Sequence, residues 1–215
     1  MRYPVGILGN ETEFKKYWYL AQRFNSPPGH DGVDINLQTG GNTDLGEPLY
    51  AIADGSIRYI HNHHPDKLFG LHFALEIQGP WGTRWAHYAH CDPKDFPQEP
   101  QVVREGQMIA RLGKTGTQLA HLHFSILKVE PDTIGGIDTV SYAYKTLMAY
   151  WEDPVKFIQQ WMLVETPQPA ASPIATNEGL MRVIAEQKQE LEEAKDMKRR
   201  LVKTIEDLLR ILEGE

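Results

Sequence analysis

Two histidines, His121 and His123, stand two positions apart in an apolar stretch. The stretch, from residue 119 to about residue 129, predicts a β-strand. Because side chains alternate between the two faces of a strand, both imidazoles would point to the same side. Two imidazoles on one rigid face can bind a metal together, or one can bind it while the other acts on a substrate. A pair of exposed strand histidines without function would show the same spacing.

A second candidate pair, His30 and Asp34, lies near the start of the chain. Alternating Val33, Ile35 and Leu37 predict a strand here, and the even spacing of the pair would put both side chains on one face. A neutral nitrogen and an anionic oxygen are both good zinc ligands. The alternative is that Asp34 caps a turn and His30 is an ordinary loop residue.

The strand predicted over residues 84–90 carries two more histidines, His87 and His90. In a regular strand they face opposite sides, so they cannot both serve one site. We choose His90 as the candidate. The single cysteine, Cys91, should then point away from His90, and we interpret it as a buried or half-buried thiol.

Three more histidines lie between residues 61 and 64. We interpret this segment as a polar connection after a hairpin rather than a metal site, because it contains a proline and has no fixed strand geometry. The hairpin itself is predicted from strands at 49–53 and 56–60, joined by a tight turn at Asp54-Gly55.

Further elements complete a mainly β domain. A strand at 73–77 is expected to pair with strand 84–90 through a glycine-containing turn. Toward the end of the domain a short helix is predicted over 155–161, with Asp153 as its N-cap and Pro154 at its first position.

Composition limits the class of protein. The chain has 215 residues, ordinary hydrophobic content and a net charge of −7, so we expect a globular protein of one main domain plus an appendage. The absence of a basic field argues against nucleic acid as a partner. One cysteine allows no intramolecular disulfide. No stretch reaches the ~20 apolar residues of a membrane helix, and charged residues at 11, 13, 15 and 16 interrupt the place of a signal-peptide core.

The C-terminal part has a different character. Residues 164–176 are rich in proline and alanine and predict a linker, and 177–215 predict a helix with a seven-residue repeat. We favour a self-associating coiled coil over a lone amphipathic helix that docks on its own domain, because the linker detaches it. The two core positions of the repeat are occupied by Ile184, Leu191, Lys198, Ile205 and Leu212, and by Leu180, Gln187, Ala194, Leu201 and Leu208.

The order of these motifs resembles the M23 family of zinc endopeptidases, the lysostaphin and LytM-like peptidoglycan hydrolases. The likeness runs from about residue 24 to residue 158. It rests on His30-x-x-x-Asp34, Ala53-Asp54-Gly55, Tyr88-Ala89-His90, Glu105-Gly106-Gln107 with Gly113-Lys114-Thr115-Gly116, His121-Leu122-His123-Phe124 and Asp153-Pro154.

The resemblance implies an antiparallel β-sheet peptidase domain of the LytM type, similar to a duplicated hybrid motif, over residues 1–163. It also implies a Zn²⁺ cofactor with His30, Asp34 and His123 as ligands, and His90 and His121 as catalytic histidines. Three protein ligands leave one zinc position open for water, whose pKa falls toward ~7. The chain has no HExxH glutamate, so histidine is the evident base.

The resemblance further implies a zinc-dependent endopeptidase that uses a zinc-bound water to cut peptide stems or cross-bridges of bacterial peptidoglycan. Its location would be extracellular or facing the cell wall. Since no signal peptide is visible, release without a classical signal, as for phage lysis or virion proteins, is one expectation, and prior removal of a signal is the other. The alternative function is a non-catalytic LytM-like module that binds the wall or activates a partner.

Overall fold

The computed structural model describes residues 1–27, 29–62, 68–134 and 149–162, all within the unit Met1–Glu165. The predicted linker at 164–176 and coiled coil at 177–215 lie outside the described residues, as do His63 and His64.

The described elements are mainly strands, as predicted. The helices are α1 (Glu11–Tyr17), a 3-10 helix (Pro131–Ile134) and α3 (Pro154–Met162). The strands are β1 (Trp18–Gln22), β2 (Val33–Leu37), β3 (Pro48–Tyr50), β4 (Gly55–His61), β5 (His72–Gly79), β6 (Gly82–Ala89), β7 (Gln101–Val103), β8 (Met108–Arg111), β9 (Leu122–Leu127) and β10 (Trp151–Glu152).

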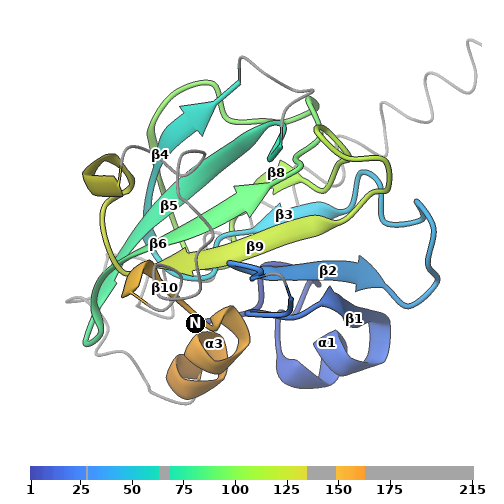
Figure 1. Ribbon diagram of the computed structural model, residues 1–215, viewed down its shortest axis with the longest axis horizontal. Helices are drawn as coiled ribbons and strands as arrows, with labels where there is room; N and C mark the ends of the chain where they lie inside the picture. Colours follow the sequence, from blue (N-terminus) through green and yellow to red (C-terminus); the bar gives the residue numbers. More distant parts are fainter. Residues whose placement is uncertain (28, 63–67, 135–148, 163–215) are drawn as a thin grey trace, which may run out of the picture. The chain divides into compact units, whose positions relative to one another are not determined.

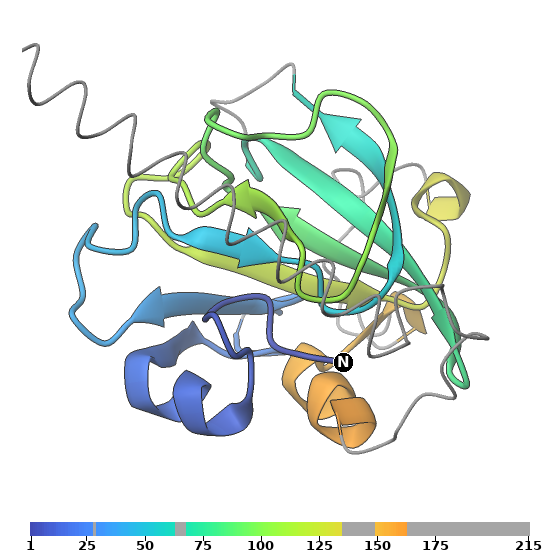
Figure 2. The same ribbon diagram turned by 180° about the vertical axis from the view of Figure 1, so that it is seen from behind.

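Eight of these strands form one antiparallel sheet. Its order is β1-β2-β9-β6-β5-β4-β7, and β10 pairs with β9 beside that path (Figure 1). The remaining strands, β3 and β8, form a two-stranded sheet, which Figure 2 shows in front of the larger one. Strands β2 and β9 are therefore neighbours, and Asp34 of β2 lies opposite His123 of β9 although 89 positions separate them along the chain.

One predicted hairpin is confirmed and another is wrong. Strands β5 and β6 pair from Phe73↔Tyr88 to Gly79↔Gly82, as expected. The hairpin predicted at Asp54-Gly55 does not form, because β3 pairs with β8 while β4 pairs with β5 and β7. The chain crosses between the two sheets here. The backbone N–H of Ala51 donates to Gln107 and its carbonyl accepts from Gly106, so these groups are satisfied away from β4.

The two faces of the large sheet have different roles. On one face Leu122, Phe124 and Ile126 of β9 join the main hydrophobic core, which also includes residues of β3 and β8. On the other face a smaller apolar cluster contains Trp85 of β6, Leu127 of β9 and Trp151 of β10. His123 lies between Leu122 and Phe124 and so belongs to this second face.

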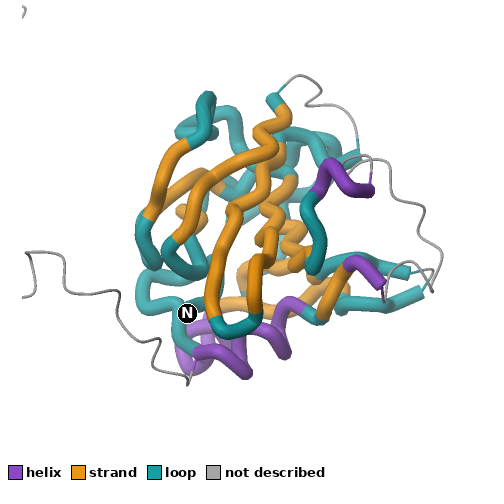
Figure 3. Tube along the Cα trace, turned by 90° about the vertical axis from the view of Figure 1, so that its left-hand side faces the viewer, coloured by secondary structure: helices purple, strands orange, loops and turns teal. Residues whose placement is uncertain are grey.

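Helices α1 and α3 lie beside one another at the β1 side of the large sheet, whereas the 3-10 helix lies away from them (Figures 1 and 3). Gln159 of α3 donates through its side-chain amide to Glu11 of α1 at 3.3 Å. The predicted cap of α3 is confirmed, because Asp153 Oδ1 accepts from the backbone N–H groups of Val155 and Lys156 at 3.0 and 3.2 Å. None of the helices in the described ranges has the length and apolar character that crossing a membrane requires.

Candidate active site

Three side chains from β2, β9 and the turn before β2 meet at one point. The pairing of β2 with β9 sets Asp34 opposite His123, and the turn brings His30 alongside them. Asp34 Oδ1 lies 3.2 Å from His30 Nε2 and 3.1 Å from His123 Nδ1. The two ring nitrogens are 3.1 Å apart, which closes a nearly equilateral triangle.

The triangle fits a cation. Tetrahedral coordination with bonds of ~2.0–2.1 Å places ligand atoms roughly 3.3–3.4 Å apart. Hydrogen bonds alone explain this arrangement poorly. If both rings donated to Asp34, the two N–H groups would lie side by side and their protons would repel each other. These same three residues are the group that could hold a metal ion among the described residues. Histidine nitrogen with carboxylate oxygen suits zinc and leaves a fourth position open.

Outer contacts orient both rings. His30 Nδ1 lies 3.3 Å from the backbone carbonyl of Arg23, to which it can donate its proton. His123 Nε2 lies 3.4 Å from Asp31 Oδ1. A proton on each of these outward nitrogens leaves the lone pairs of His30 Nε2 and His123 Nδ1 directed at the triangle.

The charges within the triangle follow from the same contacts. Burial raises the pKa of Asp34, but the close imidazoles of His123 and His30 outweigh burial and hold the carboxyl pKa well below its ordinary value. Burial lowers the pKa of His123, but the carboxylates of Asp31 and Asp34 outweigh it and raise that pKa. Asp34 is therefore an anion at neutral pH, as a zinc ligand must be.

His90 reaches the site through a break in its strand. Strand β6 ends at Ala89, and His90 has a φ of 60°, in the left-handed region. Its Nδ1 lies 2.8 Å from the carbonyl of Thr115, and its ring centroid is 4.5 Å from that of His121. Burial first, and then the charge of His121, lower the pKa of His90 to about 3, so the ring is neutral.

Because of this break, the prediction that His87 and His90 face opposite sides of a regular strand is wrong. A regular strand would have kept His87 and His90 on opposite faces, whereas their ring centroids lie 5.9 and 6.2 Å from that of His123. Thr115 supports the turn, because its hydroxyl accepts from the backbone N–H of Leu71 and donates to the carbonyl of Cys91, both at 2.9 Å.

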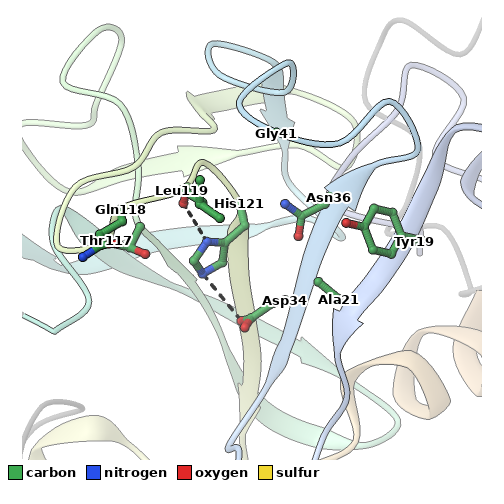
Figure 4. A pocket seen from close by; sticks show the side chains of 9 residues that line it. All are labelled: Tyr19, Ala21, Asp34, Asn36, Gly41, Thr117, Gln118, Leu119 and His121. Atoms are coloured by element: carbon green, nitrogen blue, oxygen red, sulfur yellow. Dashed lines mark hydrogen bonds and ion pairs between the residues drawn. The ribbon is translucent and has the colours of Figure 1, made fainter.

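His121 lies just outside β9, where the alternation expected for a strand no longer determines its direction. Its Nδ1 is 3.0 Å from the carbonyl of Leu119, and its Nε2 is 3.8 Å from Asp34 Oδ1 (Figure 4). Donation from Nδ1 leaves Nε2 as an unprotonated nitrogen beside the triangle. Both His90 and His121 are thus oriented by backbone carbonyls.

An open pocket adjoins Asp34 and His121 (Figure 4). It has a volume of about 450 Å³ and is bordered by strands β1 and β2 and by the segment before β9. The pocket offers amide, hydroxyl and carboxylate groups next to the triangle. It is lined by Tyr19, Ala21, Asp34, Asn36, Gly41, Thr117, Gln118, Leu119 and His121.

Other histidines lie behind the triangle. His87 is fully buried, with Nε2 at 3.0 Å from His72 Nδ1 and Nδ1 at 3.3 Å from Ser125 Oγ. Burial, and then the charge of His72, hold the pKa of His87 well below its usual range. The ring of His61 stacks on that of His72 with centroids 4.4 Å apart.

Cys91 is fully buried, as expected, and burial raises the pKa of its thiol far above the usual range. It is therefore a core residue.

The sequence patterns assign no role to Asp31 or Thr115. An acidic residue directly after His30, in a segment otherwise rich in glycine and apolar residues, is the signal that could have singled out Asp31.

Comparison with known proteins agrees with this class of protein, an antiparallel β-sheet protein with a His-Asp-His group. Residues 28–134 match Peptidase family M23, and the chain belongs to this family. No curated protein sequence gives a match.

Three solved structures illustrate the similarity. A zinc-containing peptidase from Vibrio cholerae is 29% identical, with a TM-score of 0.44 over 58% of this chain and 35% of that one. The catalytic domain of lysostaphin from Staphylococcus simulans is 20% identical, with a TM-score of 0.46 over 70% of this chain and 98% of that domain. A mutant catalytic domain of the prophage-encoded M23 protein EnpA from Enterococcus faecalis is 21% identical, with a TM-score of 0.42 over 55% and 92% of the two chains. This chain thus spans about a third of the length of the Vibrio peptidase.

Proposed function

We propose that this chain is a zinc-dependent endopeptidase that hydrolyses peptide bonds in the stems or cross-bridges of bacterial peptidoglycan. Its membership of the M23 family supplies the reaction class. The observation that carries the proposal is the triangle of His30 Nε2, Asp34 Oδ1 and His123 Nδ1, with sides of 3.1–3.2 Å. These three residues are the proposed zinc ligands.

Bound zinc would act as a Lewis acid and lower the pKa of a coordinated water toward ~7. His121 would accept a proton on Nε2, which its Nδ1 bond to the Leu119 carbonyl leaves free. The resulting imidazolium could then protonate the amine of the broken peptide bond. His90 is more costly to charge because it is buried, so we assign it a neutral role as a hydrogen-bond partner of the substrate.

The open pocket beside Asp34 and His121 would receive the substrate. Its amide and hydroxyl groups match the N–H and C=O groups of a peptide, and its position brings a peptide bond next to the triangle. The bond itself, whether in a glycine cross-bridge or between D-Ala and a diamino acid, would be identified by mass spectrometry of fragments released from defined cell walls.

The test is release of fragments from purified walls by the zinc-loaded protein, by the chelated protein and by His123→Ala. We expect activity in the first case only, restored to the chelated protein by added zinc. Full activity of the chelated protein or of His123→Ala would contradict the proposal. Metal analysis separates it from the alternative of a non-catalytic wall-binding module: absence of bound zinc at neutral pH would favour that module.

We also propose that the protein works outside the cell or facing the cell wall, with peptidoglycan as its partner and phage or virion context as one setting. The repeat at 177–215 would provide self-association or docking to a partner.

A further inference from the structure

Asp31 is a buried carboxylate to which the proposed mechanism gives no part. Its exposed fraction is 2%, and it lies in the turn between the candidate ligands His30 and Asp34. A buried carboxylate needs a donor or a positive partner. Among the ion pairs of the described residues, its partner is His123, whose Nε2 lies 3.4 Å from Asp31 Oδ1.

Gly32 makes this close approach possible. A Cβ atom at Gly32 would lie 2.4 Å from the backbone oxygen of Phe124 and 3.0 Å from both Cε1 and Nε2 of His123. Such distances are shorter than van der Waals contact, so only glycine allows the backbone to press against this edge of the ring. The segment before β2 is therefore shaped around the side of His123 that faces away from the triangle.

The two nitrogens of His123 face two different carboxylates. Nδ1 is 3.1 Å from Asp34 Oδ1 inside the triangle, whereas Nε2 faces Asp31 outside it. Neither His123 Nε2 nor Asp31 Oδ2 has a hydrogen-bond partner in the described part of the chain, so the 3.4 Å contact between Nε2 and Asp31 Oδ1 is an ion-pair contact without hydrogen-bond geometry. A neutral imidazole carries one proton. When that proton is on Nε2, it lies between the ring and the Asp31 carboxylate.

We propose that Asp31 is a positioning residue, which holds His123 in the tautomer protonated at Nε2 and so presents the Nδ1 lone pair to the metal. The inference rests on the proposed zinc binding. A carboxylate beside the far nitrogen of a ligand histidine fixes the ring and increases its basicity, and removing such a partner typically costs 10–100-fold in metal affinity.

The first measurement is the zinc dissociation constant by competition with a chromophoric chelator. Asp31→Leu removes both charge and acceptor, and we expect zinc to bind about 100-fold more weakly. Asp31→Asn keeps one acceptor oxygen, and we expect a loss of about tenfold. If the leucine variant does not fold, the asparagine variant alone decides.

Asp44→Asn is the matched control. Asp44 is also a buried carboxylate, with an exposed fraction of 1%, but its Oδ2 accepts from the side-chain amide of Asn36 at 3.3 Å and does not touch the triangle. We expect this variant to lose some stability and to keep the zinc affinity of the wild type. A loss of affinity equal to that of Asp31→Asn would attribute the effect to general destabilisation and overturn the proposal.

The second measurement is the tautomer of His123 in the metal-free protein, from its ¹⁵N chemical shifts. We expect Nε2–H in the wild type and a mixture of tautomers in Asp31→Asn. A folded Asp31 variant with unchanged zinc affinity and unchanged tautomer would overturn the proposal. If the wild type itself binds no zinc, the proposed function fails, while the tautomer of the metal-free protein still decides the role of Asp31.

Discussion

At the scale of single residues, His121 and His123 are two histidines only two positions apart, yet their surroundings differ. His123 lies in β9, opposite Asp34, with an exposed side-chain fraction of 4%. His121 lies before the strand, with a fraction of 16%, and its Nε2 is farther from Asp34 Oδ1, at 3.8 Å. These differences support the proposed division, in which His123 binds the metal and His121 transfers the proton.

This division predicts opposite behaviour of two alanine variants. His123→Ala should lose bound zinc, because one of three ligands is missing. His121→Ala should keep zinc and lose 10²–10⁴-fold in kcat, the usual contribution of a general acid or base. Metal content after dialysis and turnover on wall fragments measure the two properties. A His121→Ala protein without zinc would show that His121 belongs to the ligand set.

At the scale of elements, the site depends on how the segments around His90 are tied together. Gly70, at a φ of 60°, approaches the carbonyl of Thr115, where a Cβ atom would lie 2.2 Å from the oxygen. The backbone N–H of His90 donates to Phe69 and that of Cys91 to Leu71, both at 2.9 Å. The segment around residue 70, the end of β6 and the loop at 113–116 thus hold His90 jointly.

Thr115→Val tests this linkage. The substitution leaves the backbone N–H of Leu71 without its acceptor, so the free energy of unfolding should fall by about 1–3 kcal/mol. It should also lower kcat, with KM less affected, because the Thr115 carbonyl orients His90. Urea unfolding and steady-state kinetics measure these effects. Thr83→Val is the control, since Thr83 is exposed on β6 and should change stability by less than about 0.5 kcal/mol. Equal effects of the two substitutions would count against the linkage.

At the scale of the whole molecule, burial of histidines links stability to pH. His87 is fully buried and its pKa is held well below the usual value, so it stays neutral in the folded protein. In the unfolded chain the same side chain binds a proton below about pH 6.5. Below that pH the unfolded state binds more protons than the folded state. The contribution of His87 to the free energy of unfolding is therefore fully present above pH 6.5 and is lost as the pH drops below it.

The contribution of His87 can be measured with His87→Gln. We compare the metal-free proteins, measured in the presence of a chelator. In the wild type, protonation of His87 in the unfolded chain should lower the free energy of unfolding by up to about 1.4 kcal/mol for each pH unit below 6.5. The variant should lack that part of the slope, while the two proteins should have parallel pH dependence above pH 7.5. Urea denaturation at pH 5 to 8 provides the comparison. Identical slopes below pH 6.5 would mean that His87 is protonated in the folded state.

Oligomeric state is a second property of the whole chain. From the seven-residue repeat, we expect a chain that ends at residue 164 to stay folded and to lose self-association. Sedimentation of the full and shortened chains measures this. The same number of subunits in both would remove the repeat as the cause of association.

Local patterns were sufficient for several elements. Asp153-Pro154 predicts the start of α3, and the glycine-flanked turn predicts the β5–β6 hairpin, because caps and tight turns depend on neighbouring residues alone. The hairpin at Asp54-Gly55 was wrong because strand partners are chosen over long distances. Each sequence pattern there is compatible with a strand, but only the whole fold decides that β3 pairs with β8.

The sequence by itself determined the residue types and spacings that relate this chain to the M23 family, including the His-Asp and His-x-His motifs. Only the tertiary structure decided that His90 turns back toward His121, that Asp31 reaches the far side of His123, and that His72 and His87 lie behind the site. The physical reason is that strand alternation holds only while the backbone stays regular. The positive φ of His90 and the close approach at Gly32 depend on contacts with Thr115 and Phe124, which are distant in the chain.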